Sequence, residues 1–266
     1  MSQYSRTEMI FGKDAIAKLF DASIAVFGVG GVGGFAVEAL TRSGIGKIDL
    51  YDYDVITLSN LNRQLHTTMR NIGQYKVDAA KSRILEINPN CIVGTNKMVY
   101  SPETSGDIDL AQYDYVIDAI DTISGKVELA VKAFEKAVPI ISAMGAGNKL
   151  ETTMFEVADI FDTSVCPLAR VMRHELRKRG VESLKVVYSK EPAAKMHSDF
   201  LNAQAGMESD ESQESQESDD IGMILKKTGE ETNPARSKKI PPGSTSFVPP
   251  IVGMIIAGEV IRDLIR

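Results

Sequence analysis

A glycine-rich segment and an acid that follows it could bind a nucleotide. The glycines include Gly28, Gly30, Gly31 and Gly33. Glycine permits a tight turn in which backbone N–H groups, at the start of a helix, approach phosphate closely. Asp52 lies 19 positions after Gly33, the usual spacing for a carboxylate that accepts hydrogen bonds from a ribose. The same pattern also occurs in tight turns that bind no ligand. It therefore predicts a nucleotide site only together with further residues of the right chemistry.

Two basic side chains beyond Asp52 suit a triphosphate. Arg63 lies in a polar segment, and Lys76 begins a predicted helix, where its charge opposes the helix dipole. A polyphosphate would compensate for a cation in that position. Two cations and a helix N-terminus can polarise a departing pyrophosphate while a nucleophile attacks the α-phosphorus. The alternative is that both are ordinary surface charges.

Further polar residues complete the predicted site. Asp121 follows a predicted buried strand, so it would lie beside the phosphates and could hold Mg²⁺. The other members of the set are Ser59, Asn60 and Thr122. A nicotinamide dehydrogenase needs one acid for the ribose and little else here, so the set favours splitting of a triphosphate over hydride transfer.

Alternating apolar strands and helices must position these residues. Strands are predicted over 24–27, 47–51, 115–118 and 138–142, and helices over the run that ends at 43, over 76–88 and over 124–137. This alternation predicts an α/β fold, a doubly wound, mostly parallel (Rossmann-like) sheet with helices on both faces and a smaller, irregular C-terminal part. Ligands of such sheets bind at the carboxyl ends of the strands.

The flanking segments are less regular. We expect a helix over 8–20, a long loop over 55–75, one or two strands over 91–99, an edge strand over 152–159, a helix over 167–179, and strands over 184–188 and 244–248. Pro249 and Pro250 then turn the chain into a final helix. The residues of this helix that should face the core are Ile251, Ile255, Val260, Ile261 and Leu264.

We expect one domain over residues 1–266. Its parts are a nucleotide-binding α/β core (1–160), a basic helix and strand (161–202), a flexible acidic insertion (203–239) and a C-terminal strand and helix (240–266). The insertion contains Glu-Ser-Asp-Glu-Ser-Gln repeats that are nearly free of apolar side chains. Such a segment cannot offset the entropy cost of ordering.

Composition limits the class of protein. A chain of 266 residues that is 43% hydrophobic can bury a large core, and a formal charge of −6 argues against a protein that coats nucleic acid. Two cysteines, Cys91 and Cys166, cannot form a disulfide framework, so we expect a reducing, cytoplasmic setting. We expect no secretory signal and no stable membrane insertion, because the apolar run 251–258 is far shorter than the roughly 20 residues that span a bilayer.

Several motifs together resemble the ThiF-type adenylating enzymes, which are related to the activators of ubiquitin and of sulfur-carrier proteins. They are Gly28-Val-Gly-Gly-Val-Gly33, Asp52-x-Asp54, Ser59-Asn-Leu-Asn-Arg-Gln64, Gly73-x-x-Lys76 and Asp118-Ala-Ile-Asp121. The resemblance implies ATP and Mg²⁺ as cofactors, and a homodimer in which Arg6 reaches the ATP site of the partner. It assigns nucleotide contacts to Gly31 and Asp52, phosphate contacts to Asn60, Arg63 and Lys76, and metal binding to Asp121.

The second half of the chain resembles one branch of these enzymes, the tRNA threonylcarbamoyladenosine dehydratases. The segments that carry the resemblance are 162–180, 186–192 and 242–250. It implies that ATP adenylates the threonyl carboxylate of a modified adenosine in tRNA, with loss of pyrophosphate, and that ring closure then releases AMP. No zinc is expected, because paired Cys-x-x-Cys motifs are absent from the sequence. A monovalent cation and a sulfur-transfer partner are left open.

A basic helix is the candidate surface for tRNA. Arg170, Arg173 and Arg177 follow at i, i+3 and i+7 and would share one face, next to Lys178 and Arg179. Such a stripe supplies phosphate binding that does not depend on sequence. The spacing fits a solvated helix face equally well, and the resemblance favours RNA.

Three other functions are compatible with parts of the pattern. The nearest is the same adenylation of the C-terminal glycine of a sulfur-carrier or ubiquitin-like protein. A second is a non-catalytic NAD(H)-sensing module, a hypothesis that Arg63 and Lys76 do not support. A degenerate adenylating protein could serve as a scaffold for a sulfur-transfer partner.

Overall fold

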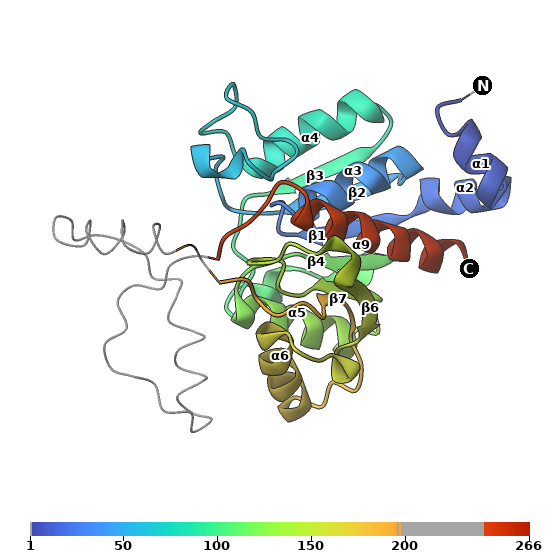
Figure 1. Ribbon diagram of the computed structural model, residues 1–266. Coiled ribbons are helices and arrows are strands. Elements are labelled where there is room, and N and C mark those ends of the chain that lie inside the picture. The colour runs from blue at the N-terminus through green and yellow to red at the C-terminus, as the bar shows by residue number, and fades with distance from the viewer. Residues whose placement is uncertain (1, 196, 198–241) are drawn as a thin grey trace, which may run out of the picture.

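A seven-stranded sheet organises the part of the chain that the computed structural model describes, residues 2–195, 197 and 242–266 (Figure 1). Its strands are β1 (Ser23–Phe27), β2 (Lys47–Tyr51), β3 (Ile92–Asn96), β4 (Tyr115–Asp118), β5 (Ile140–Ala143), β6 (Phe155–Asp159) and β7 (Lys185–Ser189). Their order is β3-β2-β1-β4-β5-β7-β6, and each pairing is parallel except that of β6 with β7. The expected acidic insertion, 203–239, lies outside the described residues.

Helices cover both faces of this sheet. They are α1 (Ser5–Phe11), α2 (Lys13–Asp21), α3 (Gly33–Ser43), α4 (Lys76–Ile87), α5 (Ile123–Glu135), α6 (Pro167–Lys178) and α9 (Val248–Ile265). Helices α2, α3, α4 and α9 share a core on one face, and α5 and α6 pack on the other (Figure 1). The prediction of a doubly wound, mostly parallel α/β fold is therefore confirmed.

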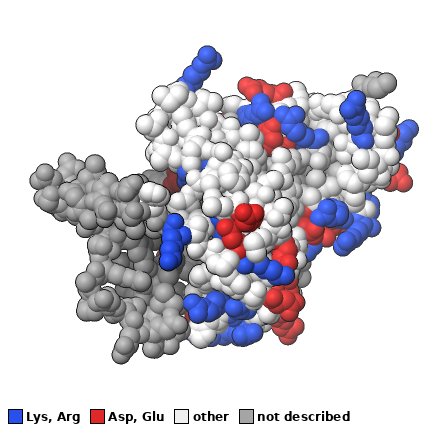
Figure 2. Space-filling model, viewed as in Figure 1, with Lys and Arg blue, Asp and Glu red and all other residues white. Residues whose placement is uncertain are grey.

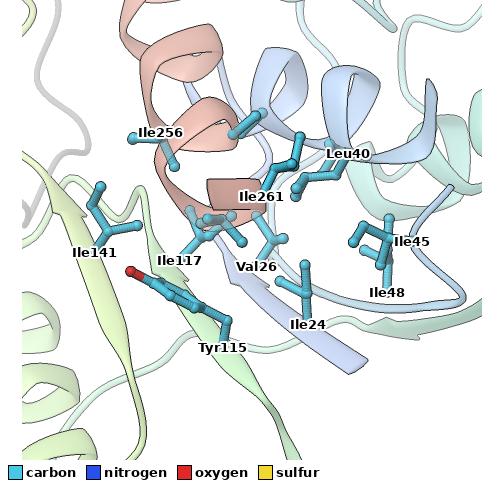
Figure 3. Close-up of a cluster of buried hydrophobic side chains, with 14 of the residues drawn as sticks. Ile24, Val26, Leu40, Ile45, Ile48, Tyr115, Ile117, Ile141, Ile256 and Ile261 are labelled. Atoms are coloured by element: carbon cyan, nitrogen blue, oxygen red, sulfur yellow. The ribbon is translucent and has the colours of Figure 1, made fainter. Parts of the chain in front are cut away.

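Side chains of the central strands alternate between these two faces. Ile24 and Val26 of β1 point toward α3 and α9, where they share a buried cluster with Leu40 and Ile256 (Figure 3). Phe27 belongs to the core on the opposite face. Burial on both faces explains why the central strands are unbroken apolar runs in the sequence.

Two expectations about the ends of the chain are wrong. The helix expected over 8–20 is two helices, α1 and α2, separated by Gly12 with a φ of +85°. A side chain rarely adopts that conformation, so the chain bends where glycine allows it. No strand forms over 244–248, because α9 already begins at Val248. Pro249 and Pro250 occupy its first turn, where a missing N–H breaks no helical hydrogen bond.

The predicted core-facing residues of α9 are confirmed at Val260 and Ile261, which are buried, and at Ile255 and Leu264, which pack partly buried against the core. The prediction is wrong for Ile251. Val252, Ile256 and Val260 form a buried stripe with helical spacing, whereas Ile251 is 37% exposed. The stripe holds α9 against α3, on the sheet face that Figure 1 shows above β1 and β4. None of the helices in the described ranges is both long and apolar enough to cross a bilayer.

The strand order places a crevice between β1 and β4. The chain runs from β1 to β2 on one side, and β4 lies on the other side of β1. Such a reversal separates the loops that leave the two strands at their carboxyl ends, which is where α/β sheets bind ligands. The loops after β1, β2 and β4, with the first residues of α3 and α4, carry the residues predicted to bind the nucleotide.

Candidate active site

The turn between β1 and α3 requires glycine at two positions. Gly28 has a φ of +88°, and a Cβ added to it would lie 2.4 Å from the carbonyl oxygen of Ala119. A Cβ added to Gly33 would lie 1.9 Å from the carbonyl oxygen of Gly28. Within the described residues, the N–H groups of Gly30 and Gly31 donate to no other group. These donors, at the start of a helix, can bind an anion.

Asp52 is fixed beside this turn. Its carboxylate accepts hydrogen bonds from the backbone N–H groups of Val29 at 2.7 Å and Asp54 at 2.9 Å. Burial raises the pKa of Asp52, and the positive charge of Lys76 opposes this effect. The side chain is therefore held in one orientation at the end of β2, where a ribose hydroxyl could reach it.

Lys76 is buried at the first position of α4. Its ammonium group forms an ion pair with Asp54 and lies 3.9 Å from the carboxylate of Asp52. The lysine is only 6% exposed. The chain itself therefore supplies acids that compensate for a cation at a helix N-terminus, and the position of Lys76 does not by itself require a polyphosphate.

The loop after β2 brings Arg63 over the glycine turn. A Cβ added to Gly31 would lie 3.3 Å from Cγ of Arg63 and 3.1 Å from Cβ of Pro249 on α9. Nη1 of Arg63 donates to the carbonyl oxygen of Ser59 and to Oδ1 of Asn62, both at 3.0 Å. The guanidinium is thus oriented by its own loop.

Asn60 holds the same loop together. It ends a short 3₁₀ helix (Leu58–Asn60), and its Oδ1 accepts from the N–H of Thr57 at 3.1 Å. Thr57 in turn caps the helix by accepting from the N–H of Asn60. Such a reciprocal cap satisfies two backbone donors and makes the loop rigid.

These loops enclose a cavity of about 350 Å³, within the range of small-ligand sites. The predicted site residues that line it are Gly28, Gly30, Gly31, Asp52, Asn60, Arg63, Lys76, Asp121 and Thr122. Gly33 and Ser59 do not line it: Gly33 packs against Gly28, and the hydroxyl of Ser59 bonds to that of Thr57 at 3.0 Å.

Part of the cavity wall is formed by residues that the sequence did not predict. Met98, Val99 and Tyr100, which follow β3, line the cavity, as do Gln64 and Pro249. Apolar and aromatic side chains can cover the face of a nucleobase. Residues 98–100 follow a strand, as site residues of such sheets often do. The segment contains no recognisable motif, so its position alone was too weak to predict a wall of the cavity.

Asp121 offers one carboxylate to a metal. It is exposed, whereas Asp118 is fully buried and lies 3.0 Å from the ammonium group of Lys126. No group of three His, Cys, Asp or Glu side chains in the described part of the chain could hold a metal by itself. Mg²⁺ at phosphate sites often uses one or two carboxylates with phosphate and water. Asp121 therefore fits a metal that arrives with a triphosphate.

Arg6 lies far from this cavity. It follows Tyr4 by two residues, and the ring of Tyr4 packs 5.1 Å from that of Phe20, next to the turn at Gly44. That turn leads into β2, so α1 lies at the amino end of the sheet, opposite the loops of the cavity (Figure 1). A five-residue strand spans roughly 17 Å, which an arginine side chain cannot bridge.

The basic helix α6 is partly engaged within the chain. Nη1 of Arg173 donates to the carbonyl oxygen of Thr163 at 3.0 Å. The guanidinium of Arg177 lies 5.1 Å from the ring centre of Phe161. The predicted three-arginine stripe is therefore not a row of free cations. Basic side chains still gather over the region of α6 in Figure 2, with acidic side chains beside them.

The sequence matches a known family along almost its full length. A model of the ThiF family matches residues 4–266. The chain belongs to the ThiF family. One relative is the tRNA threonylcarbamoyladenosine dehydratase of Bacillus subtilis (strain 168), which is 40% identical over 267 residues. The match covers 100% of this chain and 96% of the relative. The enzyme of the same name from Escherichia coli (strain K12) is 36% identical over 175 residues, 66% of the chain and 65% of the relative.

Solved structures of one such dehydratase have the same fold. The E. coli tRNA N6-threonylcarbamoyladenosine dehydratase TcdA in complex with AMP gives a TM-score of 0.79 at 26% identity, covering 98% of this chain and 93% of that chain. The complex of the same enzyme with ATP gives a TM-score of 0.76 at the same identity and coverage. Both AMP and ATP are therefore ligands of a protein with this fold.

Proposed function

We propose that this chain uses ATP to dehydrate threonylcarbamoyladenosine in the anticodon loop of a tRNA. The observation that carries the proposal is the match of the whole chain to a dehydratase of that name, at 40% identity. The cavity agrees with it, because glycine N–H groups, two cations and three acids converge there. Adenylation of the C-terminal glycine of a carrier protein is less favoured, because the full-length match bears the dehydratase name.

Adenylation makes the leaving group that a carboxylate lacks. The threonyl carboxylate oxygen attacks the α-phosphorus of ATP, the bond to the β-phosphate oxygen breaks, and pyrophosphate departs. The N–H groups of the glycine turn hold phosphate oxygens, and Arg63 and Lys76 take up the charge of the departing pyrophosphate. Asp52 accepts hydrogen bonds from the ribose. Mg²⁺, held by Asp121 and the phosphates, would neutralise further charge.

Ring closure completes the dehydration. The carbamoyl group next to the threonyl side chain attacks the carbonyl carbon of the mixed anhydride and gives up an N–H proton to water, and AMP leaves with the former carboxylate oxygen. The nucleophile and the activated carbonyl belong to one nucleoside, so the step needs little beyond orientation. No covalent enzyme intermediate is required, in agreement with the burial of Cys91 and Cys166.

We also propose a homodimer that completes each site. Arg6 cannot reach the cavity of its own chain, and it is exposed on α1. In a twofold dimer it can enter the cavity of the partner as an arginine finger.

The tRNA would lie across the exposed cations Arg170, Arg177, Lys178 and Arg179 of α6.

Mass spectrometry of tRNA nucleosides tests the proposed function. Purified protein, ATP, Mg²⁺ and tRNA that carries threonylcarbamoyladenosine are incubated without a sulfur-transfer protein. We expect the nucleoside to lose one water in step with ATP consumption, and turnover would also show that no sulfur donor is needed. Unchanged nucleoside, together with pyrophosphate exchange that requires a carrier protein, would favour the alternative substrate.

A further inference from the structure

Gln64 is a buried side chain at the cavity whose amide oxygen has no hydrogen-bond partner among the described residues. It is 6% exposed and lines the cavity. Its Oε1 atom is buried and takes part in no hydrogen bond within the described residues. A buried amide oxygen without a hydrogen-bond donor is costly, and an apolar side chain of the same shape would avoid that cost. The amide is therefore poorly explained as a structural contact.

The backbone at Gln64 is held independently of its side chain. The N–H of Gln64 donates to the carbonyl oxygen of Asn60 at 3.1 Å. Its carbonyl oxygen accepts from the N–H of Thr67 at 3.2 Å and from the hydroxyl of Thr67 at 2.8 Å. A change of the side chain should leave this turn intact, so its chemistry can be tested separately from the fold.

The other amide atom lies beside the glycine turn. A Cβ added to Gly30 would lie 3.8 Å from Nε2 of Gln64, which is the nearest atom to that position. The N–H groups of Gly30 and Gly31 are without acceptors in the described chain, and Arg63 extends over Gly31. Backbone and side-chain donors thus gather on one side of the cavity, an arrangement that suits a tetrahedral anion.

We propose that Gln64 is a further catalytic residue, whose Nε2 donates a hydrogen bond to the phosphoryl group held at the glycine turn. The identity of that group rests on the proposed function, which makes it the α-phosphoryl group of ATP. Its non-bridging oxygens carry charge while the carboxylate attacks and pyrophosphate leaves. A neutral amide supplies a donor there without adding a third positive charge to Arg63 and Lys76.

Three variants of the full chain test the proposal. Gln64→Met keeps the length of the side chain and removes both polar atoms, and Gln64→Glu keeps the shape and replaces the donor by a negative charge. Gln74→Met is the matched control, because Gln74 is an exposed glutamine of the same loop. The measurements are the melting temperature, the affinities for AMP and for adenosine by calorimetry, and the rate of AMP formation with ATP, Mg²⁺ and tRNA.

We expect Gln64→Met to melt at or above the temperature of the wild type. It should form AMP about 10- to 100-fold more slowly, because a hydrogen bond to a charged group is lost. Its affinity for AMP should fall while its affinity for adenosine stays unchanged. Gln64→Glu should lose more than Gln64→Met on each phosphate-dependent measurement, and Gln74→Met should match the wild type.

Two results would overturn the role of Gln64. One is wild-type AMP affinity and rate in Gln64→Met. The other is a lower melting temperature with equal losses of AMP and adenosine affinity in both Gln64 variants, which would make the amide structural. Failure of the wild type to modify tRNA would sink the proposed function alone, because the comparison of AMP with adenosine needs no tRNA.

Discussion

At the scale of single residues, replacing Asp121 by alanine should reduce activity without reducing stability. Its carboxylate is exposed and makes no hydrogen bond within the described residues, so Asp121→Ala should change the free energy of unfolding by less than about 0.5 kcal/mol. The formation of AMP should fall by about 100-fold or more, because a metal that arrives with ATP loses its protein ligand. Asp162→Ala, at an exposed aspartate outside the cavity, is the control. Turnover at the wild-type rate with a normal melt would remove the metal role.

His66 should make stability depend on pH. Burial, with a smaller effect of Lys76, lowers the pKa of His66 from 6.5 to about 4. Below pH 6.5 the unfolded chain binds a proton on this imidazole, and the folded chain does not until about pH 4. The free energy of unfolding should therefore fall by up to roughly 3 kcal/mol as pH drops through that window.

Urea unfolding at pH 7 and pH 5 checks the His66 prediction. His66→Gln should lose less stability between the two pH values than the wild type. His174→Gln, at an exposed histidine of α6, should lose as much as the wild type. Equal losses in all three proteins would mean that His66 titrates normally in the fold.

At the scale of elements, the contact of α9 with α3 should control the cavity. A Cβ added to Gly253 would lie 2.3 Å from the carbonyl oxygen of Val32, so Gly253→Ala must move α9 away from α3. We expect a loss of about 1–3 kcal/mol in the free energy of unfolding. The affinity for ATP should also fall, because Pro249 on the same helix lines the cavity.

Gly258 provides the control on the same helix. A Cβ added there meets only the guanidinium tip of Arg262, at 3.5 Å. Gly258→Ala should therefore raise the free energy of unfolding by up to about 1 kcal/mol, through helix propensity. Urea unfolding and calorimetry with ATP measure both variants. Similar behaviour of the two alanine variants would contradict the close approach of α9 to α3.

Local patterns were sufficient for some elements and failed for others. The strand Tyr115–Asp118 was predicted to the residue, because its first three residues form a buried apolar run and Asp118 marks its carboxyl end. The segment 244–248 has β-forming residues, but its end belongs to a helix that two prolines start. Met98, Val99 and Tyr100 line the cavity because β3 lies next to β2 in the sheet. The order of strands in a sheet cannot be predicted from a local sequence pattern.

At the scale of the whole molecule, two inactive variants should complement each other. If Arg6 acts in the partner's cavity, a dimer of one Arg6→Ala chain and one Lys76→Ala chain contains one complete site. An equal mixture with free subunit exchange should recover about a quarter of the wild-type rate of AMP formation, because half of the dimers are mixed and each has one active site of two. No recovery, with mixed dimers present by native mass spectrometry, would place Arg6 outside the site.

The products of ATP test the central claim most directly. Arg63, Lys76 and the glycine turn are proposed to support cleavage between the α- and β-phosphorus. With ATP, Mg²⁺ and modified tRNA, chromatography of the nucleotides should show AMP and pyrophosphate in amounts equal to the dehydrated nucleoside. Formation of ADP and phosphate, or dehydration without consumption of ATP, would contradict the account.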